Sequence, residues 1–380
     1  MKVYREAVLP KGFLANGLFC GIKREKKLDL ALFYSEFPAK VSALFTTNKI
    51  QSAPIKINKR HLKKNQDSFR AIIVNSGNAN AFTGKEGITD ALEIIGELSK
   101  RLKIKKEEIL VASTGVIGKR LPVLKIKRSI PNLVSGLSSD GIIKAKEAIL
   151  TTDTFPKELT IKFRLGKNTV TLCGIAKGAG MIFPNLATML CFIFTDINIT
   201  RSALDKALKE VVDFSFNCIT VDGCMSTNDS VIILANGKAG NPLIKANSLA
   251  FKIFRENLKK LCLELAKLIV KDAEGATKFI KIKVNQAKNY SEAKKVALSI
   301  ANSNLFKSAI YGENPNFGRI ASAVGASGIN LNEDKLKIRV SSLKRKEIEV
   351  EVFLNQGKSS AVVYTSDLTP EYIKINATYN

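Results

Sequence analysis

The sequence predicts an α/β fold of a layered, sandwich-like type, in which mixed or antiparallel sheets are covered by helices. Apolar runs of strand length, such as residues 109–112 and 189–194, recur between longer segments of helical spacing. These strands and helices do not follow the regular spacing of a doubly wound parallel sheet. At 380 residues the chain is compatible with two or three folding units, and no internal repeat or low-complexity linker divides it.

The first half of the chain predicts short strands that end in polar or glycine-containing turns. Apolar residues at helical spacing indicate a helix over residues 90–102, and another helix is expected to end near Leu150. Between residues 159 and 175 a β-hairpin turns at Gly166-Lys167 and directs the chain to Lys177. The other predicted strands of this half are residues 28–33, 41–45, 70–74 and 109–112.

The second half predicts the longest helix of the chain and a β-rich end. This helix starts at Asn247 or Ser248, both good N-cap residues, and runs to Val270 with apolar residues on one face. Polar loops are expected at residues 216–230 and 311–319. The remaining predicted helices are residues 203–214 and 292–302, and the remaining strands are residues 231–235, 278–284, 336–340, 347–354 and 360–365.

The stretch of residues 177–190 is the strongest candidate for chemistry. Its Phe183-Pro184-Asn185 segment is typical of a turn, since proline fixes one φ angle and asparagine tolerates unusual ones. Thr188 then opens a buried apolar strand. A hydroxyl held where a tight turn enters a strand has the rigid placement that a nucleophile needs. The alternative is a structural threonine buried beside a loop.

The histidine and cysteine content limits the mechanisms open to the chain. The single histidine, His61, lies in a basic, surface-like segment and is not expected to act as a catalytic base. Any nucleophile must therefore find a different base. The six cysteines never form a Cys-x-x-Cys pair and sit mostly in apolar patterns, so we expect reduced core thiols, no disulfide framework and no metal site.

The formal net charge of +26 raises the question of nucleic-acid binding. The lysines are spread over the whole length, however, and no nucleic-acid-binding motif accompanies them. No apolar run approaches the roughly 18 residues of a membrane span, and the N-terminus has no signal-peptide core. We expect a cytoplasmic protein without nucleic-acid or membrane partners, whose charge favours small dicarboxylic substrates.

Further polar candidates follow strand and helix ends. Thr114-Gly115 comes directly after a predicted strand, where exposed backbone N–H groups could form an oxyanion hole. Thr151 begins a run of four short oxygen-bearing side chains, and Glu274 stands between small residues at a helix-to-strand junction. The alternatives are an ordinary strand-end turn for Thr114-Gly115 and a solvated loop acid for Glu274.

A series of motifs extends over essentially the full chain. Residues 177–190 match the pattern Lys-Gly-x-Gly-Met-Ile-x-Pro-Asn-x-Ala-Thr-Met-Leu. The other motifs of the series are residues 12–13, 21–23, 45–48, 75–80, 113–118, 151–154, 219–223, 226–229, 274–277, 314–320 and 375–377. Together they closely resemble the ArgJ family, the glutamate N-acetyltransferases or ornithine acetyltransferases of arginine biosynthesis. The resemblance implies an ArgJ/DmpA-like version of the layered fold.

The resemblance also implies that Thr188 is first a self-cleavage nucleophile and then the catalytic one. Autocatalytic cleavage of the Ala187-Thr188 bond would give an α chain of residues 1–187 and a β chain of residues 188–380, which form one intertwined catalytic unit. A threonine hydroxyl can attack its own preceding carbonyl when a strained turn presents it. The freed α-amine of Thr188, with a reference pKa of ~7.7–8.0, would then act as base for the hydroxyl.

The implied reaction is ping-pong transfer of an acetyl group from N2-acetylornithine to glutamate through an acetyl-enzyme, without a required cofactor. Thr114 and Gly115 match the family's oxyanion-hole pair. Lys177 suits a substrate carboxylate and Glu274 a substrate ammonium. The substrate-binding positions of the family are matched by Thr151, Lys177, Thr188, Glu274 and Asn376. The family further implies an α2β2 heterotetramer, and the sequence leaves open whether acetyl-CoA is a second acetyl donor.

An alternative activity and two departures from the family pattern stay open at this point. A related N-terminal-nucleophile amidase or aminopeptidase would pass its acyl group to water. The family pattern usually ends with a serine or threonine one residue beyond Asn380, and that residue also contacts the substrate. In this chain the contact is missing, truncated or replaced by the Asn380 carboxylate. Cys224-Met225 stands where many members carry Asp-Thr.

Overall fold

The computed structural model describes all residues except 66, 184–188 and 379–380. The described residues form two compact units. The first holds those of segments 1–178, 189–214 and 226–265, and the second those of segments 179–183, 215–225 and 266–378. The chain therefore enters the second unit three times. Each unit contains residues from before and after the predicted cleavage site, whereas the cleavage itself stays a prediction.

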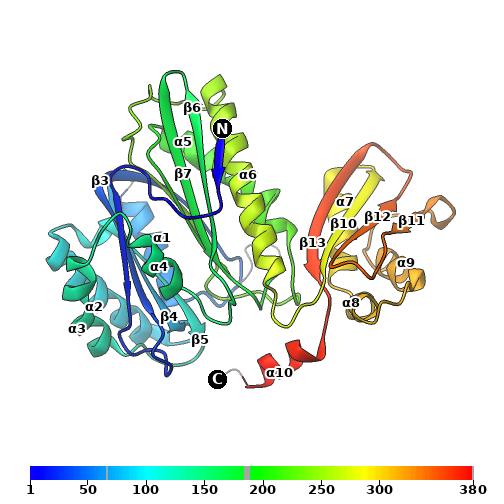
Figure 1. Ribbon diagram of the computed structural model, residues 1–380, viewed down its shortest axis with the longest axis horizontal. Helices are drawn as coiled ribbons and strands as arrows, with labels where there is room; N and C mark the ends of the chain where they lie inside the picture. Colours follow the sequence, from blue (N-terminus) through cyan, green and yellow to red (C-terminus); the bar gives the residue numbers. More distant parts are fainter. Residues whose placement is uncertain (66, 184–188, 379–380) are drawn as a thin grey trace. The chain divides into compact units, whose positions relative to one another are not determined.

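In the described part of the first unit, nine strands join into one mixed sheet with the order β1-β6-β7-β8-β9-β3-β4-β5 and with β2 paired to β3 (Figure 1). Neighbours are antiparallel except β8 with β9 and β4 with β5. The strands are β1 (Lys2–Tyr4), β2 (Phe13–Leu18), β3 (Leu30–Phe45), β4 (Phe69–Asn78), β5 (Ile109–Val116), β6 (Lys157–Leu165), β7 (Asn168–Lys177), β8 (Leu190–Thr195) and β9 (Ser230–Ala235). The helices are α1 (Ala53–Lys64), α2 (Gly84–Leu102), α3 (Val123–Ser135), α4 (Ile142–Ala148), α5 (Arg201–Asp213) and α6 (Leu249–Lys271), whose last turns belong to the second unit, with a 3-10 turn at Lys106–Glu108.

Strand β3 differs from the sequence prediction, which placed two separate strands at residues 28–33 and 41–45. Its first half pairs with β2 and β4, and its second half pairs with β9. The register with β4 shifts between Tyr34 and Ala39, around Pro38. Proline is tolerated in a strand at such an irregularity because no ladder hydrogen bond is required of it there. The apparent break in the pattern is thus a bend in one long strand.

The two halves of this sheet face each other across a shared apolar core. The Phe33 ring of β3 lies 5.5 Å from the Phe192 ring and 5.1 Å from the Phe194 ring of β8, between centroids. Buried residues of β4, β5, β9 and α4 belong to the same cluster. Helices α1, α2 and α3 cover the outer face of β3, β4 and β5. Leu261 and Leu265 of α6 pack on β7. The predicted layered α/β fold with mixed sheets is confirmed.

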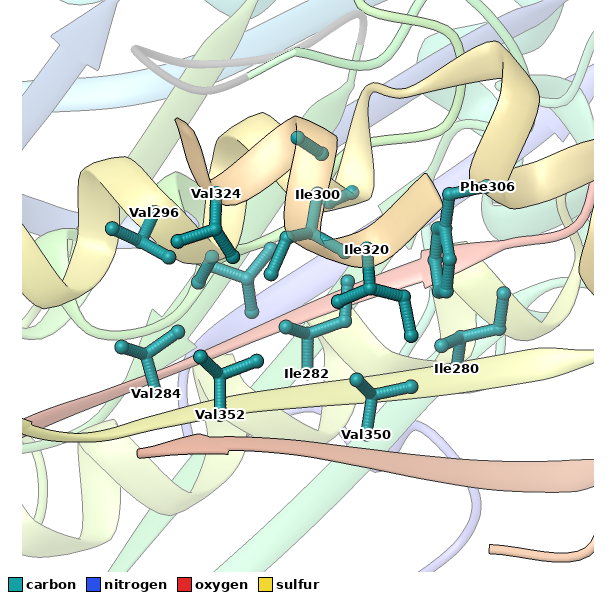
Figure 2. Close-up of a cluster of buried hydrophobic side chains, with 14 of the residues drawn as sticks. Ile280, Ile282, Val284, Val296, Ile300, Phe306, Ile320, Val324, Val350 and Val352 are labelled. Atoms are coloured by element: carbon teal, nitrogen blue, oxygen red, sulfur yellow. The ribbon is translucent and has the colours of Figure 1, made fainter. Parts of the chain in front are cut away.

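The second unit contains a smaller mixed sheet, ordered β11-β12-β10-β13, with β10 parallel to β12. Figure 2 shows Ile280, Ile282 and Val352 of this sheet pointing toward Val296 and Ile300 of α7. Burial of this alternating apolar face against the helices stabilises the unit. Its elements are β10 (Phe279–Ala287), α7 (Tyr290–Ala301), α8 (Asn304–Tyr311), α9 (Phe317–Gly325), β11 (Lys337–Val340), β12 (Glu347–Phe353), β13 (Ser359–Ser366) and α10 (Pro370–Thr378), with 3-10 turns at Phe216–Cys218 and Glu333–Lys335.

The environment of His61 corrects the prediction that it lies at the surface. It sits on α1 with 6% of its area exposed, and its Nδ1 lies 2.7 Å from the Ile109 carbonyl oxygen. That distance requires Nδ1 to carry the proton and donate it to the carbonyl. The His61 side chain therefore connects α1 to the start of β5 through this hydrogen bond. Within the described residues, no helix has the length and apolar character needed to cross a bilayer.

Four of the six cysteines are core residues, as predicted. Cys173, Cys191, Cys218 and Cys262 are buried, and no disulfide joins any of the cysteines, all of which lie in the described part of the chain. Burial raises the pKa of the Cys173 thiol to about 12 and that of Cys191 well above its ordinary value. A thiol whose pKa is raised by burial is a poor nucleophile. These side chains are core residues.

Candidate active site

The last residue of β7, Lys177, is the centre of the predicted site in the first unit. Its side chain is buried, and its Nζ donates to the Thr151 hydroxyl over 2.7 Å and to the Thr114 hydroxyl over 3.3 Å. Thr114 lies near the end of β5 and Thr151 follows α4. The structure thus brings three of the predicted site residues, from well-separated parts of the chain, into direct contact.

Asp153 is the counter-charge of this buried lysine. Its carboxylate lies 3.7 Å from the Lys177 Nζ and 2.5 Å from the Nζ of Lys157, and its side chain has no exposed area. It also accepts the backbone N–H groups of Gly178 at 2.6 Å and Thr151 at 2.9 Å. Burial alone would raise the pKa of Asp153, but the two ammonium groups and these hydrogen bonds hold that pKa well below its ordinary value. The Asp153 carboxylate is therefore an anion at neutral pH.

Gly115, beside Thr114, is held close to the neighbouring strand. In the parallel β4–β5 ladder it pairs with Gly77, and the register shifts directly after that pair. Its φ is +131°, and a Cβ at this position would lie 2.3 Å from the carbonyl carbon of Gly77. Only glycine fits this backbone. A rigid, irregular strand end next to the Lys177 cluster is a suitable place for N–H donors that stabilise an oxyanion.

The predicted nucleophile Thr188 and its neighbour Ala187 lie outside the described residues. The next residue, Met189, donates its N–H to Asp229 Oδ1 at 2.9 Å. Asp229 is 1% exposed, and no described donor makes a well-formed hydrogen bond to its Oδ2. Burial raises the pKa of Asp229 well above its ordinary value, although the Met189 N–H, Lys177 and nearby hydroxyls act against this. A carboxyl group thus fixes the residue that follows the predicted nucleophile.

Two further predicted residues, Glu274 and Asn376, meet in the second unit. Asn376 Nδ2 donates to Glu274 Oε2 over 2.8 Å and to the Tyr372 carbonyl over 3.0 Å. Glu274 N–H donates to the Ala179 carbonyl at 3.0 Å. A Cβ on Gly180 would lie 2.2 Å from Glu274 Oε2, so the carboxylate occupies space that only glycine leaves open.

Sequence reasoning missed several charged residues around these predicted positions. Asp153 stands inside the Thr-Thr-Asp-Thr motif but was not singled out, and Lys157 follows it without any motif signal. Lys23 belongs to a recognised motif, and its side chain packs over Gly77. Burial lowers the pKa of Lys23 to about 8, against the attraction of Asp29 and with some repulsion from Lys177. Spacing along a chain does not reveal which charges a fold will bury together.

Comparison with known proteins identifies one family. The model of the ArgJ family matches residues 14–344 and 339–380. The chain is 44% identical to the arginine biosynthesis bifunctional protein ArgJ of Caldanaerobacter subterraneus subsp. tengcongensis, over 98% of this chain and 97% of the relative. It is also 44% identical to the protein of the same name from Geobacter sulfurreducens, over 97% of this chain and 99% of the relative.

Two solved structures are similar to parts of the chain. The arginine biosynthesis bifunctional protein ArgJ from Bacillus halodurans covers 48% of this chain and 97% of its own, at 39% identity and a TM-score of 0.46. The ornithine acetyltransferase from Mycobacterium tuberculosis complexed with ornithine covers 49% of this chain and 99% of its own, at 34% identity and a TM-score of 0.45.

Proposed function

Because this chain belongs to the ArgJ family and is an acetyltransferase of arginine biosynthesis, we propose that it moves the acetyl group of N2-acetylornithine to glutamate through an ester on Thr188. The observation that supports this most directly is the buried cluster in which Lys177 contacts Thr114 and Thr151 beside Gly115. It combines a fixed cation, two hydroxyls and a rigid strand end. These are the groups that acyl transfer to or from an anionic substrate requires.

The chemistry follows from a nucleophile that carries its own base. The α-amine of Thr188, freed by self-cleavage, accepts the hydroxyl proton while the oxygen attacks the acetyl carbonyl carbon. The C–N bond of N2-acetylornithine then breaks, and the departing nitrogen takes that proton, so that ornithine leaves. The amine of glutamate attacks the resulting ester and gives up one of its own protons through the Thr188 α-amine to the Thr188 oxygen, so that the ester C–O bond breaks, N-acetylglutamate leaves and the hydroxyl is restored. No cofactor takes part in these steps.

Thr114, Gly115, Lys177 and Thr151 are the groups proposed for the carbonyl oxygen and the substrate carboxylate. We assign the oxyanion hole to Thr114 and Gly115, whose positions are fixed by the β4–β5 ladder. Lys177, Lys157 and Asp153 together carry one excess positive charge, since two ammonium groups share one carboxylate. A buried excess positive charge with the Thr151 hydroxyl beside it favours a bound carboxylate.

Glu274 and Asn376 are the groups proposed for the substrate ammonium. Glu274 carries a negative charge and is hydrogen-bonded to Asn376, which leaves Glu274 held in one orientation. A carboxylate of fixed orientation selects an ammonium group on the substrate. We assign both residues to recognition of the amino-acid substrates.

Two further properties belong to the proposal. Cleavage between Ala187 and Thr188 yields α and β chains of similar length, which assemble as an α2β2 heterotetramer. The curated relatives are named bifunctional, and this supports acetyl-CoA as a second acetyl donor to glutamate. A cytoplasmic location stays a prediction.

The test is an acetyl-transfer assay on purified protein. With N2-acetylornithine and glutamate, we expect equal amounts of ornithine and N-acetylglutamate, and no product from Thr188→Ala. Acetate in place of N-acetylglutamate would instead support the amidase or aminopeptidase alternative, which the comparisons do not favour. A parallel reaction with acetyl-CoA and glutamate decides the second donor, and native mass measurement decides the assembly.

A further inference from the structure

The segment just before the predicted cleavage site is held by Glu274 and by residues 220–222, of which the proposed chemistry uses only Glu274. In the second unit, the Ile182 carbonyl accepts hydrogen bonds from the Val221 N–H and the Thr220 hydroxyl, both at 2.9 Å. On the other side, the Ala179 carbonyl accepts the Glu274 N–H. Residues 179–182 are therefore tied at both ends before the chain reaches residue 184.

Asp222 is the centre of this network. Its Oδ2 accepts the Met181 N–H at 2.6 Å, and its Oδ1 accepts the N–H groups of Ile182 and Cys224, both at 3.0 Å. Met181 has a φ of +56°, in the left-handed region that costs a non-glycine residue ~1–2 kcal/mol. Charge-assisted hydrogen bonds of this kind offset such a cost. The carboxylate thus holds the segment in a conformation that its own sequence does not favour.

Tyr372 connects the same carboxylate to the substrate residues. Its hydroxyl donates to Asp222 Oδ2 at 3.1 Å, and its carbonyl accepts from Asn376 Nδ2, which also donates to Glu274. Hydrogen bonds at the two ends of Tyr372, its hydroxyl and its backbone carbonyl, therefore connect Asp222 and the 181–182 segment to Asn376 and Glu274. In such a network, loss of one member changes the position of the next.

A buried lysine completes the surroundings of this carboxylate. Lys307 is 2% exposed and its Nζ donates to the Val221 carbonyl. Burial lowers the pKa of Lys307 to about 8, and the negative charges of Asp222 and Asp367 act in the opposite direction. The residue next to Asp222 is thus held from the core side, which limits how far the carboxylate can move.

We propose that Asp222 is a positioning residue for both stages of the reaction. Before cleavage it anchors residues 181–182, and so provides a fixed point five residues ahead of the Ala187-Thr188 bond that must reach attack geometry. After cleavage it holds the end of the α chain and, through Tyr372, sets the orientation of Asn376 and Glu274. This inference rests on the proposed self-cleavage and acetyl transfer.

Two variants separate the two stages. Asp222→Asn keeps the size of the side chain but leaves one accepting oxygen, so that either the Met181 and Tyr372 bonds or the Ile182 and Cys224 bonds are lost. We expect it to slow self-cleavage about tenfold to hundredfold, the range expected for a small misplacement of reacting groups. Tyr372→Phe removes only the hydroxyl that donates to Asp222 and leaves the backbone donors of residues 181, 182 and 224 on that carboxylate. It should therefore cleave at the wild-type rate but, with α10 no longer tied to Asp222, raise KM for N2-acetylornithine severalfold at unchanged kcat.

Asp367→Asn is the matched control. Asp367 is a buried carboxylate of the same unit that accepts the N–H groups of Thr277 and Lys278 at 2.9 and 3.0 Å, where β10 begins. Its loss should lower the melting temperature about as much as Asp222→Asn while leaving the cleavage rate at that of wild type. A cleavage defect that merely followed loss of stability would appear in both variants.

The experiment follows conversion of newly synthesised single chain into two chains on a denaturing gel, and then measures KM and kcat of the mature enzymes. Slow cleavage confined to Asp222→Asn, together with a raised KM in Tyr372→Phe, supports the inference. If the wild type cleaves and Asp222→Asn cleaves equally fast, the inference is overturned and the proposed function stays intact. A wild type that stays one chain overturns the proposed self-cleavage and this inference with it.

Discussion

The Nζ of Lys177 lies 2.7 Å from the Thr151 hydroxyl and 3.7 Å from the Asp153 carboxylate, inside the protein. The ammonium therefore has a hydroxyl partner on one side and a counter-charge on the other. Because Asp153 is shared with Lys157, the counter-charge does not cancel the positive charge of the cluster. This arrangement supports the proposed role of Lys177 in binding a substrate carboxylate.

Lys177→Met should weaken substrate binding more than it weakens the fold. It removes the cation assigned to the substrate carboxylate, whereas Asp153 keeps Lys157 and the backbone donors. A hydrogen bond to a charged group contributes ~1.5–3 kcal/mol, so KM for N2-acetylornithine should rise about tenfold to hundredfold. Steady-state kinetics of the mature enzyme check this. The exposed Lys260→Met on α6 is the control, and an unchanged KM in Lys177→Met would remove the assigned role.

Asp153→Asn should be among the most destabilising single substitutions. It leaves the fully buried Lys157 and the buried Lys177 without their carboxylate, and breaking a buried ion pair in this way costs about 3–5 kcal/mol. The depressed pKa of Asp153 means that its contribution is present above the ordinary aspartate pKa of about 3.9 and is lost as pH falls further. Denaturant unfolding at several pH values should show the variant and wild type converging in acid.

The exposed Asp140→Asn is the matched control for that series. It changes the net charge by the same amount without disturbing a buried pair. A loss of stability in Asp140→Asn equal to that of Asp153→Asn would show that the effect reports charge alone.

The effect of Asp229→Asn on stability should depend on pH in the opposite direction to that of Asp153→Asn. The raised pKa of Asp229 means that the folded state binds the proton more tightly than the unfolded state does. Its contribution to the free energy of unfolding therefore falls as pH rises above about 3.9. Asparagine does not titrate and can still accept the Met189 N–H, so the stability of the variant relative to wild type should increase with pH. Both proteins are measured in the uncleaved Thr188→Ala background, and a relative stability that decreases with pH would contradict the assignment.

Gly115→Ala should disrupt the strand end assigned to the oxyanion hole. The added Cβ would meet the Gly77 backbone at 2.3 Å at a φ of +131°, and backbone strain plus overpacking together cost about 2–6 kcal/mol. Gly118→Ala is the control, since its φ is +85° and no atom lies within 4 Å of the added Cβ. Gly118→Ala should lower the free energy of unfolding by only about 1–2 kcal/mol. Equal melting temperatures for the two variants would show that the approach to Gly77 is not restrictive.

The layered fold could be predicted because it depends on local patterns. The hairpin of β6 and β7, the long helix α6 with Ser248 capping its first turn, and the strands after residue 336 all carry clear periodicity. Helices α1 and α3 were not predicted, since their sequences are rich in lysine and arginine and α3 contains Pro131. Residues 311–319 were expected to form a loop, but α9 begins at Phe317 with the Asn316 side chain capping it.

Some residues of the candidate site could also be predicted from local sequence patterns, and others could not. Lys177, Thr114 and Thr151 were predicted from motifs, and they prove to be in contact. The carboxylates that fix them could not be predicted, because their role depends on burial rather than spacing. Asp153 is recognised only when Lys157 is seen beside it, and Asp222 only when Tyr372 and the 181–182 segment converge on it. Motifs identify candidate substrate-binding residues, while three-dimensional packing identifies which residues hold them in place.

The most direct test of the central assignment is the mass of the β chain after the first half-reaction. Protein incubated with N2-acetylornithine in the absence of glutamate is quenched, and the chain is analysed intact and after digestion. The account predicts a chain that begins at Thr188, heavier by one acetyl group on that residue, and loss of the group when glutamate is added. A single uncleaved chain, or an acetyl group on any other residue, would contradict it.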